Sequence, residues 1–462
     1  MKVNIPQNTQ TYTKKMPSGM RAAASYINLK EADGSLATGR LGQEMLTNWL
    51  PKAVFARGLV DFTEKTFLEC TENVVVYILP VLVGTLASKL FTNKFFTKSL
   101  SETIKKGVTT TAEDLIKEGP DNKKLMPIKA AIATATLAIP LAEYSLSYVK
   151  NLFTLKLFKQ ADFNNIANLN KEKKEDVEKQ KQVKASAKKH IKIAAGIYAG
   201  CLALAALFAT KGKNSKALQS ISEAILAPGS KFFKNNEKKA ATINKYFGLD
   251  FANKGGKLAM SNGQITACVV VGGFGYFGAA KDRGKQDFKE VLYRFPLVGL
   301  YAITGSELLE KALRSRLKKQ DKCQELFEAE AHDENIEKIA NAKGATKEQI
   351  EAAKKKTSKL ANFGDLAEKL AKEKFEAKGI KATAEQLEAE ATIQFKNLLK
   401  QKSKIVLAPF IFSLGFMGFF VAGMSRYFTK YRYNKDLQNQ TQKPNFSQFD
   451  KVEFAGFGKN KV

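Results

Sequence analysis

The chain has 462 residues, 44% of them hydrophobic, and its 75 Lys and Arg against 45 Asp and Glu give a formal net charge of +30. Two His and four scattered Cys supply almost no material for a His-based catalytic site or a zinc cluster, and they exclude a disulfide scaffold. The apolar content excludes a fully disordered chain. We therefore predict that the protein is not an enzyme and has no cofactor and no metal ligands.

The first half of the chain alternates polar and apolar segments. Residues 1–40 are polar and predict a disordered N-terminal tail without a secretory signal. Residues 41–162 predict a first membrane unit with spans near 74–91 and 131–148. Residues 163–262 predict a charged helix, a span near 193–210 and a basic loop.

The second half continues the pattern. Residues 263–310 predict a membrane hairpin with spans near 265–280 and 291–309. Residues 311–404 are rich in Ala, Glu and Lys and predict a helical insertion. A last span at 405–424 precedes a basic, polar C-terminal tail at 425–462.

Two runs carry most of this interpretation. Ile193 to Thr210 has no charge in 18 residues, and Ile405 to Met424 has none in 20. Both are long enough to cross a hydrocarbon core of roughly 30 Å. Four of the six predicted spans contain a proline, a residue that membrane helices tolerate better than soluble helices do. The sequence predicts an all-α, multi-pass transmembrane helical bundle of about six spans with an extramembrane helical insertion.

The insertion has its own helix signals. Thr346 to Gln349 and Thr383 to Gln386 match the capping box, in which a Thr side chain and a Gln three residues later satisfy the first backbone N–H groups of a helix. We expect amphipathic helices in 311–404 that are suited to binding a protein partner, although a solvated helical linker fits the same composition.

Short basic flanks set the expected orientation. The ten residues from Lys281 to Glu290 and the segment from Ser425 to Lys435 are both basic, and Lys and Arg near span ends favour the cytoplasm. Six spans place both flanks on one side with the N-terminus. We therefore predict a cell (inner) membrane protein with both termini cytoplasmic, although the basic segment 211–262 argues against this orientation.

An octet with the pattern RGxxDFxE occurs twice, from Arg57 to Glu64 and from Arg283 to Glu290. Later matches follow in the same order, including Phe153-Thr154 and Phe428-Thr429. These matches predict a duplication with units near 53–162 and 279–436. On a helix, the spacing of four residues would allow ion pairs between Arg57 and Asp61 and between Arg283 and Asp287, and an ordinary pair of this kind explains the spacing as well as a functional motif does.

Two charged residues within predicted spans are candidates for a transport path. Glu143 follows Pro140 by three residues, and a carboxylate at membrane depth is costly and often functional. Arg294 is a similar case and would pair with Glu143 only if their helices meet. A position near the span end, where the side chain reaches headgroups, is the alternative for Glu143.

Two further sequence features give weaker evidence of function. Gly273 to Gly278 matches GxGxxG, but the following segment is a poor crossover helix, so close helix packing explains the glycines better than a dinucleotide site. The excess of Lys is spread over every loop and mixed with Glu. This distribution favours the anionic headgroups of a lipid bilayer over nucleic acid as the binding partner.

Three functions remain open from the sequence. The first is a structural or scaffold role of a multi-pass membrane protein, with partner-binding helices in 311–404. The second is a small-solute transporter or channel built from the two units. The third is a peripheral, basic membrane-surface protein, which high salt would release. Oligomeric state is open.

Overall fold

The computed structural model describes residues 45–79, 82–83, 86, 107–108, 110–172, 176–252, 261–320, 322–324, 326–327 and 363–441. Within these ranges the protein is all-helical with no strand, which confirms the predicted all-α class. The predicted N-terminal tail, half of the span near 74–91 including Pro80, the capping box at 346–349 and the end of the C-terminal tail lie outside the described residues.

The described helices follow one another closely. In chain order they are η2 (Met45–Trp49), α4 (Leu50–Val54), α5 (Leu59–Asn73), η3 (Val74–Ile78), α8 (Ala112–Lys117), α9 (Pro120–Lys123), α10 (Met126–Ala135), α11 (Ala138–Phe158), α12 (Phe163–Ile166), α13 (Val177–Lys211), η4 (Gly212–Asn214), α14 (Lys216–Leu226), α15 (Pro228–Phe232), α16 (Glu237–Phe247), α17 (Asn262–Arg283), α18 (Lys285–Leu300), η5 (Tyr301–Gly305), α19 (Ser306–Lys319), α22 (Phe363–Glu376), α23 (Ala384–Phe412), η6 (Ser413–Phe420) and α24 (Val421–Thr441).

Among the described residues, four helical segments are long and apolar enough to cross a membrane, and they suggest membrane association. They are Pro120–Phe158, Val177–Asn214, Asn262–Arg283 and Leu407–Asn439. The first three contain the predicted spans near 131–148, 193–210 and 265–280, and the fourth contains all but the first two residues of the predicted span at 405–424. The predicted span near 291–309 is not among the four, and its helix carries Arg294 and Glu307. A total of six spans therefore stays a prediction.

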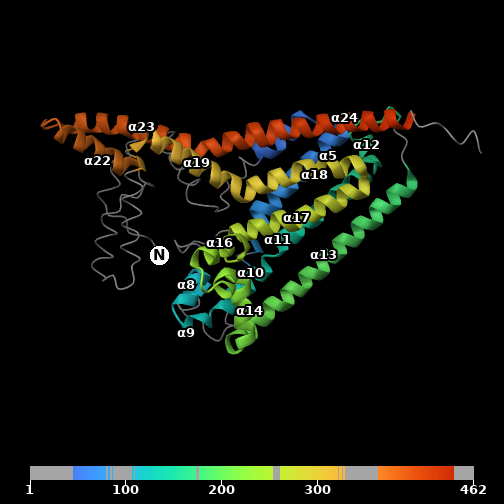
Figure 1. Ribbon diagram of the computed structural model, residues 1–462, viewed down its shortest axis with the longest axis horizontal. Coiled ribbons are helices and arrows are strands. Elements are labelled where there is room, and N and C mark those ends of the chain that lie inside the picture. The colour runs from blue at the N-terminus through green and yellow to red at the C-terminus, as the bar shows by residue number, and fades with distance from the viewer. Residues whose placement is uncertain are drawn as a thin grey trace, which may run out of the picture.

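Five helices converge at one end of the bundle, where α12 also lies (Figure 1). They are α5, α11, α17, α18 and α24, and α11 packs along α17. Gly275 of α17 permits this close approach, because a Cβ there would overlap the carbonyl oxygen of Tyr144 on α11. The glycine-rich run thus serves helix packing, as expected from its sequence context.

A separate apolar core lies at the far end of α13, where α8, α10 and α14 meet it (Figure 1). Met126, Phe208 and Leu226 are fully buried there. The predicted basic loop after α13 is largely helical in the structure. Ser215 and Asn236 explain the difference, since each side chain accepts a hydrogen bond from a backbone N–H and so begins α14 and α16.

The end of the predicted insertion is also helical. Thr383 forms the predicted capping box with Gln386 and begins α23, which packs against α22. From Ala384 to Thr441 the chain continues through α23, η6 and α24 without a break. At roughly 1.5 Å per residue this rod is about 85 Å long. This length is about twice the thickness of a bilayer, which is roughly 40–45 Å with headgroups included.

Candidate functional site

Each octet is broken by its glycine and does not lie on a single helix, which corrects the expectation from spacing. Gly58 and Gly284 precede α5 and α18 with φ of +152° and +131°, a region that favours glycine. Arg57 thus stands outside α5, and Arg283 is the last residue of α17. The pairs nevertheless form, with Arg57 Nε 3.3 Å from Asp61 Oδ2 and Arg283 Nε 3.2 Å from Asp287 Oδ2.

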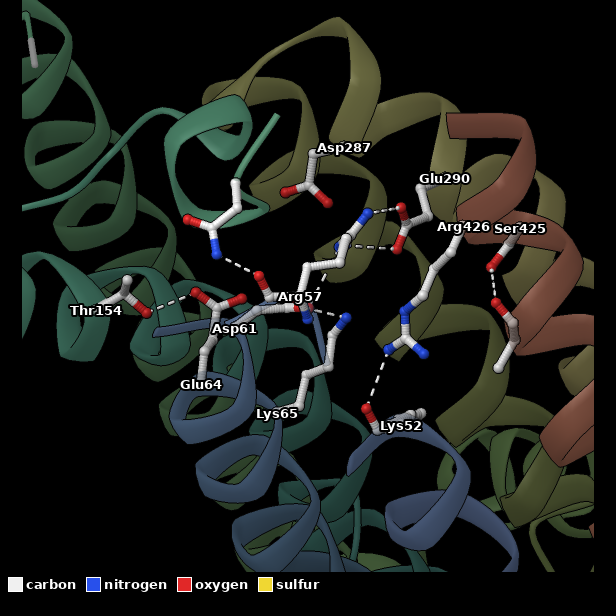
Figure 2. Close-up of polar contacts among 12 residues, drawn as sticks. Lys52, Arg57, Asp61, Glu64, Lys65, Thr154, Asp287, Glu290, Ser425 and Arg426 are labelled. Carbon is white, nitrogen blue, oxygen red and sulfur yellow. Dashed lines mark hydrogen bonds and ion pairs between the residues drawn. The ribbon is translucent and has the colours of Figure 1, made fainter. Parts of the chain in front are cut away.

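The two octets meet at one end of the bundle through crossed ion pairs. Arg57 donates from Nη1 and Nη2 to the two carboxylate oxygens of Glu290, at 2.8 and 3.2 Å (Figure 2). Arg283 Nη1 donates to Glu64 Oε1 at 2.8 Å. Each arginine therefore reaches the glutamate of the other octet. The ring of Phe163 lies near both guanidinium groups, 5.0 and 5.6 Å from their central carbons.

The helices behind the octets contact one another in a matching pattern. Phe67 of α5 stacks on Phe153 of α11, with ring centroids 4.0 Å apart. Tyr293 of α18 stacks on Phe428 of α24, with centroids 6.2 Å apart. Phe67 and Tyr293 occupy the same position relative to their octets, and Phe153 and Phe428 both begin a Phe-Thr pair. Thr154 of the first pair donates to Glu64 at 2.6 Å. The origin of this arrangement by duplication stays a prediction.

Burial and ion pairing set the charge states of the network. Burial raises the pKa of Glu64, but Arg283 and Lys150 more than offset it and bring the pKa to about 2. Burial likewise raises the pKa of Glu290, and Arg57 and Lys65 bring it to about 2. These two carboxylates therefore stay ionised at neutral pH.

In two other groups of the network, burial outweighs ion pairing, so the pKa shifts toward the uncharged form. Burial raises the pKa of Asp287 above its ordinary value, and the charge of Arg283 compensates only in part. Burial lowers the pKa of Lys65 to about 8, although Asp61 Oδ1 lies 2.9 Å from its Nζ. Lys65 can thus release its proton not far above neutral pH.

A cavity of about 140 Å³ extends from the octets along the space between α5 and α18. Its charged and polar lining includes Lys52, Asp61, Glu64, Lys65, Glu72, Lys150, Tyr276, Asp287, Glu290 and Arg294. Three of its lysines have acidic partners: Lys52 pairs with Glu69, Lys65 with Asp61, and Lys150 with Glu64 at 3.4 Å. Arg294, by contrast, makes no ion pair or hydrogen bond with any residue that the structure describes.

A second arginine nearby is only partly satisfied. Arg426 of α24 is 8% exposed and donates from Nη2 to the carbonyl oxygen of Lys52 at 3.1 Å (Figure 2). Its Nε and Nη1 have no hydrogen-bond partner within the described chain. In the sequence, the flank that contains Arg426 served only as a basic signal of orientation, and no local signal marked Arg426 as buried.

The structure places Glu143 apart from Arg294 and forms no ion pair between them. Glu143 is 4% exposed on α11 and faces Gly272 of α17, where an added Cβ would lie 3.3 Å from the Glu143 Cβ. Its Oε1 has no hydrogen-bond partner among the described residues. The nearest charges that act on it are the carboxylates of Glu72 and Glu69. The headgroup alternative for Glu143 does not fit this burial.

Several groups of the site were missed at the level of sequence. Lys65 had a local signal, because it lies four residues after Asp61. Glu69, Glu72 and Tyr276 had none, since their proximity arises only when α5 packs beside α17. The Tyr276 hydroxyl donates to Glu72 Oε2 at 2.9 Å across that contact.

Comparison with protein families, with curated proteins and with solved structures finds no match to this chain.

Proposed function

We propose that this protein is a membrane transporter that moves a small anionic or zwitterionic solute through the cavity between α5 and α18. The observation that carries the proposal is the crossed pairing of the two octets at one end of a cavity lined by charged residues. Many transporters consist of repeats that bind their substrate at the interface between them. The sequence interpretation favoured a scaffold because no ligand constellation was visible, and the cavity supplies one.

The size of the cavity limits the solute. At about 140 Å³ it is close to an apolar protein cavity of about 150 Å³ that holds benzene. A solute of roughly six to eight non-hydrogen atoms, such as a small carboxylic acid or amino acid, fits this volume.

The charges of the lining select the chemistry of the solute. Arg294 presents a guanidinium to the cavity, and no carboxylate of the described residues forms an ion pair with it. A guanidinium binds carboxylate or phosphate oxygens through a planar fork of donors. Arg426 adds a second positive charge close to Arg294, and its unpaired donors strengthen the local preference for an anion.

In the proposed transporter, the octets form the gate that closes this end of the cavity. Arg57 and Arg283 hold the starts of α18 and α5 together, so the octet end opens only when both crossed pairs separate. Gly58 and Gly284 lie at the breaks where the chain enters those helices, and such breaks absorb changes in backbone angle. The π-helical segments η3 and η5 follow α5 and α18, and π-helical turns are frequent at functional sites.

We also propose a bacterial inner-membrane location with the octet end facing the cytoplasm. The flank Lys281–Glu290 and the basic residues Arg426 and Arg432 belong to this end, and basic flanks are retained on the cytoplasmic side. The six-span topology and cytoplasmic termini belong to the same proposal. A partner-binding role for 311–404 stays a prediction, since most of its centre lies outside the described residues.

The test uses the purified full-length protein in liposomes loaded with a mixture of amino acids and small carboxylic acids. We expect at least one component to leave about tenfold faster than from protein-free liposomes, and Arg294→Ala to abolish that difference. Arg316→Ala is the matched control, because Arg316 is an exposed residue of α19. If no component leaves faster than from protein-free liposomes, the transporter proposal is wrong.

A further inference from the structure

The α5 wall and the α18 wall of the cavity differ in their acidic residues, although the aromatic contacts behind the two octets match. Glu69 and Glu72 lie 12 and 15 residues after Arg57, on α5. The residues at the same distances after Arg283 on α18 are Phe295 and Val298, and both line the cavity. Asp287 and Glu290 of α18 also line the cavity near the octets, but at these two deeper positions only α5 carries acidic residues.

Glu143 follows the same asymmetry. It precedes Phe153 by ten residues, and the residue ten before Phe428 is Gly418, which lines the cavity on the opposite side. At that corresponding position the helices pack without an acidic residue, so helix packing alone does not explain why residue 143 is a glutamate. An ionised carboxylate is costly in a membrane-buried, apolar setting unless it is paired.

Among the described residues, the titratable groups that interact with Glu143 are Glu72, Glu69, Cys268 and Tyr276, and none of them is positively charged. Gly272, against which it packs, lies one helical turn before Tyr276 on the same face of α17. Tyr276 lines the cavity and donates its hydroxyl hydrogen to Glu72, which also lines the cavity. Glu69 already has Lys52 as its partner. Glu143 is thus left facing acidic neighbours with its Oε1 unpartnered.

We infer that Glu143 is a proton-binding site that exchanges its proton with the part of the cavity lined by Tyr276 and Glu72, and that this proton drives the transport proposed above. A neutral carboxylic acid removes the cost of a buried negative charge beside other carboxylates. Its hydroxyl also supplies a donor to that acidic surrounding. The inference rests on the proposed function for its coupling role, but the site itself is testable alone.

A proton fits this site better than a metal ion. No group of three or more His, Cys, Asp and Glu side chains in the described ranges is placed to hold a metal. Tyr276 and Glu72 form a hydrogen-bonded pair that lines the cavity, and Glu143 is buried. The proton of Glu143 is exchanged with the cavity on the side where this pair lies.

The site is tested first without transport. Infrared difference spectra of the purified, full-length protein at neutral pH should contain the carbonyl band of a protonated carboxyl group, and Glu143→Gln should remove it. Glu178→Gln, at an exposed position of α13, is the control and should leave it in place. If the band is absent from the unmodified protein, or persists in Glu143→Gln, the inference is wrong.

Coupling is tested in liposomes that contain the same solute mixture and the pH-sensitive dye pyranine. A pH gradient, inside acidic or inside alkaline, should change the rate of solute efflux about tenfold. In Glu143→Gln we expect solute exchange to continue without dependence on the gradient, and Tyr276→Phe to slow the dye response. Efflux that ignores the gradient in the unmodified protein would overturn the coupling while leaving the transporter proposal intact; no efflux at all would overturn both.

Discussion

Loss of Arg57 should destabilise the protein more than loss of its partner Glu290. Glu290 is buried, with its side chain 7% exposed, and Arg57 binds both of its oxygens. Arg57→Met therefore leaves a buried carboxylate without its bidentate partner, with Lys65 and Arg426 as nearby cations, and removal of one partner of a buried pair costs about 3–5 kcal/mol. In Glu290→Gln, Arg57 still has Asp61 at 3.3 Å, so we expect a cost of about 1–2 kcal/mol.

The double variant separates the pair from the rest of the network. With both charges removed, no carboxylate is stranded, and the cost should fall at least about 2 kcal/mol below that of Arg57→Met plus Glu290→Gln. Unfolding in mixed micelles, followed by circular dichroism against denaturant, supplies the free energies. Lys285→Met is the matched control, because its pair with Asp436 is 3.4 Å long and exposed, and should cost less than about 1 kcal/mol. Strictly additive costs would refute the reasoning.

Further predictions concern pH, the octet glycines and the membrane. Because the pKa values of Glu64 and Glu290 are about 2 in the folded protein against an ordinary 4.5, their stabilisation is complete above pH 4.5 and is lost as pH falls through 2; thermal unfolding in detergent should show this fall, and Glu64→Gln should flatten it. Gly284→Ala should cost about 1–2 kcal/mol because its φ is +131°, whereas Gly196→Ala, in open space on α13, should stabilise by about 0.5–1 kcal/mol; equal unfolding midpoints for the two would contradict this. Alkaline carbonate should leave the protein in membranes, and release of intact protein would contradict the candidate spans.

The sequence alone determined the helical class and four of the apolar helices. A run such as Ile193 to Thr210 has no charge to place in water, so its length and composition fix its character without knowledge of its neighbours. Local signals fixed some details too. The capping box at Thr383 depends only on residues three apart, and the pairs of Arg57 with Asp61 and Arg283 with Asp287 depend on residues four apart.

The octets show where local pattern ceases to be enough. Their repetition was visible in the sequence, but the glycine in each was interpreted as part of a helix, because a positive φ is a property of the folded backbone and leaves no mark beyond the glycine itself. The crossed partners were not deducible either. Arg57 and Glu290 are far apart in the chain, and only the packing of α5 beside α18 brings them to 2.8 Å.

The charge balance of the cavity was decided by tertiary structure for the same reason. In the sequence, Glu143 and Arg294 looked like equivalent intramembrane charges that would pair if their helices met. In the folded protein, Arg294 instead lines the cavity, and Glu143 packs against Gly272 and interacts with the glutamates of α5. Whether a charge is paired depends on which helix faces it, and helix order and rotation in a bundle are set by packing over the whole chain.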